Sequence, residues 1–146
     1  MPQSNPEQLR TILESARTIA LVGASEKIHR PSHEVMAYLQ GRGYRVIPVN
    51  RRLAGQTLLG EQVYPDVQSL PKGVDMADLF INPERVGPVV DAVIAAGIPV
   101  VWLQRGVIDE EAANRAEEAG LSVVMDRCPK TEIPRLGVPL IPRGDC

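Results

Sequence analysis

The fold class is decided by residues 18–25, which read Thr-Ile-Ala-Leu-Val-Gly-Ala-Ser. The first five are mostly apolar, which predicts a buried strand, and Gly23 ends the apolar run. A polar loop follows, and Ser32 is a candidate N-cap for a helix with apolar residues at helical spacing. A strand, a glycine turn and a helix in this order are typical of the first unit of a doubly wound α/β fold.

The same alternation of apolar runs and helical stretches continues along the chain. Further strands are predicted at residues 45–49, 76–81, 98–103 and 121–125, and helices after the candidate caps Asn5, Asn82 and Asp109. Pro48 cannot donate a backbone hydrogen bond, so we place it at the end of the second strand. We expect a Rossmann-like three-layer α/β fold with a five-stranded parallel sheet in the order 3-2-1-4-5, covered by helices on both faces. Residues 51–70 are predicted to be mostly loop, with a short extended piece at residues 63–64. Residues 134–146 are predicted to be a tail that is either extended against the surface or frayed.

Length and composition predict a single domain over residues 1–146, with its core at about 9–137. The 146 residues are 44% hydrophobic and 23% charged, and the formal net charge of −2 gives no reason to expect nucleic acid or a membrane as partner. No apolar run approaches the length of a membrane span, and the first ten residues are polar. We interpret Cys128 and Cys146 as reduced thiols, so the expected location is the cytoplasm.

The loop after the first predicted strand is the first candidate ligand site. Its candidate contact residues are Gly23, Ala24, Ser25, Arg30, Pro31 and Ser32. Glycine permits close approach of the backbone, a helix start offers free N–H groups, and an arginine can bind phosphate through two N–H groups. The glycine pattern is not G-x-G-x-x-G and no Walker lysine is present, so an ordinary strand–helix turn explains the segment equally well.

The end of the second predicted strand bears on which nucleotide is bound. It reads Val49-Asn50-Arg51-Arg52, without the acidic residue that usually contacts the adenosine ribose in NAD-binding domains. Two adjacent cations suit a nucleotide with an extra ribose phosphate, and both NADP and coenzyme A carry one. Exposed arginines are more often simply solvated, and this alternative stays open.

Later loops offer further polar groups at the same end of the sheet. Asn82 follows the third predicted strand, although helix capping alone explains it. Gln104 and Gly106 follow the fourth strand and suit diphosphate or pantetheine contacts, whereas a polar turn is an equal alternative. Cys128 follows the fifth strand beside two cations, and most lone cysteines are inert. Glu26 and His29 share the first loop, but no metal-ligand spacing and no catalytic triad is recognisable, so the sequence does not demand an enzyme.

Several short segments, taken in order, resemble one known family. These are residues 20–25 (Ala-Leu-Val-Gly-Ala-Ser), 30–32 (Arg-Pro-Ser), 43–50 (Gly-Tyr-Arg-Val-Ile-Pro-Val-Asn), 74–76 (Val-Asp-Met), 101–104 (Val-Trp-Leu-Gln), 106–107 (Gly-Val) and 124–129 (Val-Met-Asp-Arg-Cys-Pro). Together they resemble the small stand-alone CoA-binding domain proteins, the group that includes the YccU-like proteins. That family is similar to the CoA-binding N-terminal domain of the succinyl-CoA synthetase α-subunit.

The resemblance runs from about Leu9 to Gly137 and implies a Rossmann-like fold that holds coenzyme A at the carboxyl ends of the strands. It places ligand contacts at Gly23, Ser25, Arg30, Ser32, Asn50, the loop near Tyr64, Asn82 and Gln104. Two positions depart from the family pattern, which commonly has proline where this chain has Arg51 and often arginine where it has Ile81. The synthetase's later domain has no counterpart in this chain, so ligase activity is not implied.

The leading hypothesis is therefore a non-catalytic module that binds coenzyme A or a short acyl-CoA for delivery, sensing or thiol protection. An NADP-dependent oxidoreductase, or a CoA-linked redox protein that uses Cys128, is the alternative. Candidate protein partners are a second copy of the chain or an acyl-CoA enzyme on which the module docks.

Overall fold

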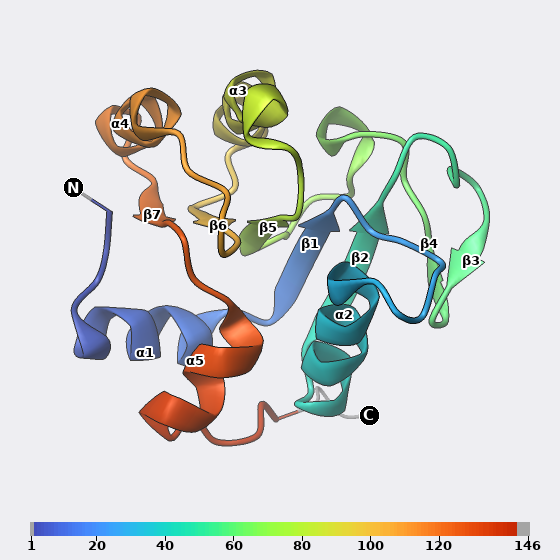
Figure 1. Cartoon of the computed structure of the whole chain (residues 1–146), viewed down its shortest axis with the longest axis horizontal. Coiled ribbons are helices and arrows are strands. Elements are labelled where there is room, and N and C mark those ends of the chain that lie inside the picture. The colour runs from blue at the N-terminus through green and yellow to red at the C-terminus, as the bar shows by residue number, and fades with distance from the viewer. Residues whose placement is uncertain (1, 143–146) are drawn as a thin grey trace.

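The computed structural model describes residues 2–142 (Figure 1). Its strands are β1 (Thr18–Val22), β2 (Arg45–Val49), β3 (Thr57–Leu58), β4 (Glu61–Gln62), β5 (Met76–Leu79), β6 (Val100–Leu103) and β7 (Ser122–Val124). Its α-helices are α1 (Pro6–Ser15), α2 (Pro31–Gly41), α3 (Val86–Ala96), α4 (Glu110–Glu118) and α5 (Pro129–Leu136). Single 3₁₀ turns lie at Val67–Ser69 and Pro83–Arg85.

The predicted parallel α/β sheet is confirmed, but its predicted strand order is wrong. The five main strands lie in the order β2-β1-β5-β6-β7, which is 2-1-3-4-5 in order along the chain. The third main strand, β5, therefore pairs with the side of β1 that faces away from β2. Leu21 of β1 lies between Pro48 of β2 and Asp78 of β5. The order is that of the flavodoxin-like doubly wound fold.

The outer side of β2 explains why β5 does not pair there. Pro48 lies within β2, without an N–H to donate, and its carbonyl accepts a hydrogen bond from the backbone of Tyr64 (3.0 Å). The backbone N–H of Asn50 donates to Tyr64 in turn (2.9 Å). A proline is tolerated on an edge strand, where a short bridge replaces a full ladder. Part of the predicted loop at 51–70 forms the β3–β4 hairpin beside this edge.

Helices cover both faces of the sheet, as Figure 1 shows. One face packs against α1, α2 and α5, around buried residues such as Leu13, Met36 and Ile133, with Trp102 from the sheet. The other packs against α3 and α4, through valines and alanines. The core is almost entirely aliphatic because the chain has only 3% aromatic residues.

The predicted caps are confirmed at three of four places. The Asn5, Asn82 and Asp109 side chains each accept a hydrogen bond from a backbone N–H of the first turn that follows. Ser32 is not a cap, because α2 begins one residue earlier, at Pro31, with Arg30 in the cap position. Proline is favoured in the first helical position, where its missing N–H costs nothing.

The predicted extended tail is wrong for its first residues. Pro134 lies inside α5, although a proline in a helix interior removes a backbone hydrogen bond. Ile133 of the same helix is inaccessible to solvent within the core that α5 shares with α1 and α2, and this burial offsets the lost hydrogen bond. Cys146 lies outside the described residues, and within residues 2–142 no helix is long and apolar enough to span a membrane.

Candidate functional site

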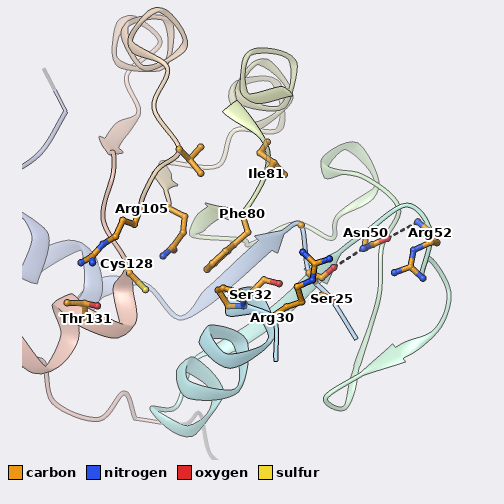
Figure 2. A pocket seen from close by; sticks show the side chains of 15 residues that line it. Ser25, Arg30, Ser32, Asn50, Arg52, Phe80, Ile81, Arg105, Cys128 and Thr131 are labelled. Carbon is orange, nitrogen blue, oxygen red and sulfur yellow. Dashed lines mark hydrogen bonds between the residues drawn. The ribbon is translucent and has the colours of Figure 1, made fainter. Parts of the chain in front are cut away.

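The carboxyl ends of the strands enclose a cavity of about 680 Å³ (Figure 2). It opens where the strand order reverses, between β1 and β5, which is the place where doubly wound sheets bind ligands. Its volume lies within the usual range for small-molecule sites. The lining residues are Gly23, Ala24, Ser25, Arg30, Pro31, Ser32, Asn50, Arg52, Phe80, Ile81, Gln104, Arg105, Val107, Cys128 and Thr131.

The first loop can enter the site only because position 23 is a glycine. Gly23 has a φ of 93°, in the left-handed region. A Cβ built on it would lie 2.1 Å from the carbonyl oxygen of Phe80, at the end of the neighbouring strand β5. The paired ends of β1 and β5 therefore meet at backbone distance and form the floor of the site.

The N-terminus of α2 forms one wall. Arg30 and Pro31 line the cavity at the start of the helix, and Ser32 is buried beside them. Within residues 2–142, the Arg30 guanidinium forms no ion pair. The first turn of a helix also offers free N–H groups and the positive end of its dipole, so this wall suits a phosphate.

Asn50 joins the loops after β1 and β2. Its Nδ2 donates to the carbonyl of Ala24 (2.7 Å), and its Oδ1 accepts from the backbone N–H groups of Arg52 (2.8 Å) and Leu53 (3.2 Å). The amide therefore fixes the relative position of the two loops. Asn50 acts in this structure as a positioning residue for the site.

The two adjacent arginines after β2 are separated by the fold. Arg52 lines the cavity and forms an ion pair with Glu26 (3.0 Å), which lowers the pKa of that exposed carboxyl chiefly through the hydrogen bond. Arg51 points elsewhere and lies 3.7 Å from Asp66. Glu26 is thus occupied by Arg52, and no contact between Glu26 and His29 supports the acid–base pair considered from the sequence.

The other end of the cavity is built by the segments after β6 and β7. Gln104 is only 8% exposed, and its Oε1 has no hydrogen-bond partner among the described residues. Arg105, Cys128 and Thr131 lie together at this end in Figure 2, away from Ser25, Asn50 and Arg52. The cavity therefore has two chemically distinct ends.

The cations beside Cys128 in the sequence are already paired. Arg127 lies 3.9 Å from Glu132, and Lys130 lies 3.7 Å from Glu34. Neither lines the cavity, whereas Arg105 does, and Arg105 forms no ion pair with any residue in the described range. Arg105 is therefore the cation available at this end of the site.

Residues 17–134 match the model of a protein family described as CoA binding domain. The chain belongs to this family. Uncharacterized protein YneT of Bacillus subtilis is 31% identical to it over 130 residues, which cover 89% of this chain and 95% of the relative. A solved structure from Thermus thermophilus, cell-free ID.343, is 40% identical with a TM-score of 0.87, covering 91% of this chain and 99% of that one.

A larger relative contains a similar segment. ADP-forming acetate–CoA ligase I of Archaeoglobus fulgidus is 25% identical to this CoA binding domain over 122 residues. The match covers 77% of this chain but 18% of the ligase. The similarity therefore concerns one part of that enzyme.

Most of the site residues predicted for this CoA binding domain line the cavity. They are Gly23, Ala24, Ser25, Arg30, Pro31, Ser32, Asn50, Arg52 and Gln104. The others do not line it: Val49 is buried in β2, Arg51 faces Asp66, Tyr64 bridges to β2, Asn82 is a cap, and Gly106 donates to Asp126. Arg105, in the predicted loop between Gln104 and Gly106, also lines the cavity. Phe80, Val107 and Thr131 were missed, because apolar residues and a helical threonine carry no binding signal in a single sequence.

Proposed function

We propose that this chain binds coenzyme A or a short acyl-CoA as a non-catalytic carrier or sensor. The observation that carries the proposal is the charge of the cavity. Among the described residues that line it, the ionised groups are arginines, namely Arg30, Arg52 and Arg105, and none is a carboxylate or a histidine. Such a site suits a ligand with several phosphates, and the family to which the chain belongs supports coenzyme A as that ligand.

The same lining supports binding without catalysis. General acid–base catalysis needs a group that exchanges protons near neutral pH, most often a histidine or a carboxylate held within hydrogen-bond reach of the substrate. No histidine or carboxylate is among the described residues that line the cavity. We place the function in the cytoplasm, where thiols are kept reduced.

An oxidoreductase that uses NADP is the second candidate, favoured by Arg52 at the end of β2. An NADP site would need the diphosphate to lie on a glycine-rich turn, and the turn here has Gly23 followed by Ala24 and Ser25. Because this turn has a single glycine, it favours a placement of the phosphates that differs from the one in an NADP site.

Isothermal titration of the full chain with coenzyme A, NADP and NAD tests the proposal. Coenzyme A should bind most tightly, and Arg30→Ala should weaken it about tenfold, because a charge-assisted hydrogen bond to phosphate is lost. Tighter binding of NADP or NAD than of coenzyme A would overturn the proposal. Light scattering with and without coenzyme A then shows whether the module also pairs with a second copy.

A further inference from the structure

The end of the cavity remote from Arg52 carries a thiol. Cys128 lines the cavity from the N-cap position of α5, and it is partly buried. Its carbonyl accepts hydrogen bonds from the N–H groups of Thr131 and Glu132 (3.0 Å each). The preceding residue is held as well, since the indole N–H of Trp102 donates to the carbonyl of Arg127 (2.8 Å). The backbone position of Cys128 is therefore fixed from both sides.

A second, independent feature at this end points to a ligand. The Oε1 of Gln104 is buried and has no partner within the described part of the chain. Buried polar atoms are almost always hydrogen-bonded, so an unpaired one in a cavity wall indicates a missing donor. The pantetheine arm of coenzyme A carries two amide N–H groups, which are donors of the kind that Gln104 lacks.

The two ends of the cavity match the two ends of coenzyme A. The ligand has phosphates at one end and a thiol at the other. If the phosphates lie against Arg30 and Arg52, the arm runs past Phe80, between the two ends in Figure 2, towards Gln104 and Cys128. This placement rests on the function proposed above.

We propose that Cys128 captures the ligand covalently, as a mixed disulfide with coenzyme A. The Cys128 thiolate attacks one sulfur of CoA disulfide, the oxidised form of the ligand. A Cys128–S–S–CoA bond forms, the CoA–S–S–CoA bond breaks, and the second coenzyme A leaves as a thiolate. The proton of Cys128 is released to solvent, and a free thiol reverses the exchange.

Intact mass measurement of the reduced full chain after incubation with CoA disulfide tests this step. One adduct should appear, which raises the mass of the chain by that of coenzyme A less two hydrogen atoms, and dithiothreitol should remove it. Cys128→Ser should abolish the adduct. Cys146→Ser, a change at the other cysteine of the chain, should retain it. An adduct that persists in Cys128→Ser and disappears in Cys146→Ser would overturn the proposal.

A second disulfide separates a guided reaction from general thiol reactivity. Capture of CoA disulfide should be at least about tenfold faster than capture of hydroxyethyl disulfide, because binding holds the reacting sulfur beside Cys128. Arg30→Ala should remove most of this difference in rate between the two disulfides. Equal rates for both disulfides would show an ordinary accessible thiol.

Calorimetry of the wild type with reduced coenzyme A, in the presence of reductant, separates this inference from the proposed function. If reduced coenzyme A binds in this titration but CoA disulfide gives no adduct in the mass measurement, covalent capture alone is overturned. Absence of binding overturns both.

Discussion

The backbone of Gly23 approaches the carbonyl oxygen of Phe80 so closely that a Cβ at position 23 would lie 2.1 Å from it. The φ of 93° also disfavours any side chain. We expect Gly23→Ala to lower the free energy of unfolding by more than about 3 kcal/mol, because a fixed backbone group must move. Urea denaturation followed by circular dichroism measures this loss.

The matched control is Gly41→Ala. Gly41 is the last residue of α2, and a Cβ there would meet nothing within 4 Å. Alanine should stabilise the helix by up to about 1 kcal/mol. Equal stabilities for Gly23→Ala and the wild type would mean that the ends of β1 and β5 can separate without cost.

Because Arg51 and Arg52 have different surroundings, we expect them to contribute differently to the preference for coenzyme A over dephospho-CoA. Arg52→Ala should reduce the preference for coenzyme A over dephospho-CoA roughly two- to fivefold, since Arg52 lines the cavity and is exposed. Arg51→Ala, a change of the same kind one residue away, should leave the preference unchanged, because Arg51 faces Asp66. Calorimetry with the two ligands and three proteins is the measurement. A larger effect from Arg51→Ala would place the ribose phosphate outside this cavity.

In the proposed complex with coenzyme A, Glu26 would compete with the ligand for Arg52. Its carboxylate holds the Arg52 guanidinium at 3.0 Å, and its negative charge repels an anion at the site. Glu26→Gln should therefore increase the affinity for coenzyme A by roughly two- to fivefold at low ionic strength. The gain should shrink as salt is added, because both groups are exposed. A decrease in affinity would instead indicate that the ion pair holds Arg52 in its binding position.

Asp78 lies at the centre of the sheet, between Leu21 and Trp102, and is completely buried. Neither carboxyl oxygen has a hydrogen-bond partner among residues 2–142. Desolvation raises its pKa well above the usual value. Above about pH 4 the unfolded chain has lost this proton while the folded protein keeps it, so the carboxyl lowers the free energy of unfolding as pH rises, by up to about 1.4 kcal/mol per pH unit.

Asp78→Asn removes this titration. We expect the stability of the variant relative to the wild type to increase between about pH 5 and pH 8, which urea denaturation at several pH values measures. The asparagine amide is buried as well, so its own cost is present at every pH and does not affect the slope. A constant difference across this range would show that Asp78 is already ionised in the folded protein.

The strand that contains Pro48 was predicted correctly, but its position in the sheet was predicted wrongly. The alternation of strands and helices correctly predicted the α/β class, and the strand 45–49 contains a proline. A proline in a strand favours an edge position, yet the predicted order placed this strand between two others. The structure puts β2 at the edge and β5 on the far side of β1.

The sequence by itself determined the parallel sheet, the three caps and the loop that carries Arg30, because these depend on short-range patterns of apolar residues, prolines and capping side chains. Only the tertiary structure decided the strand order, the helix at Pro129–Leu136, and the separation of Arg51 from Arg52. Each of these follows from long-range contacts: the Tyr64 bridge on β2, the burial of Ile133, and the pairing of Arg51 with Asp66. Residues distant in sequence make such contacts, and local spacing contains no information about which of them will meet.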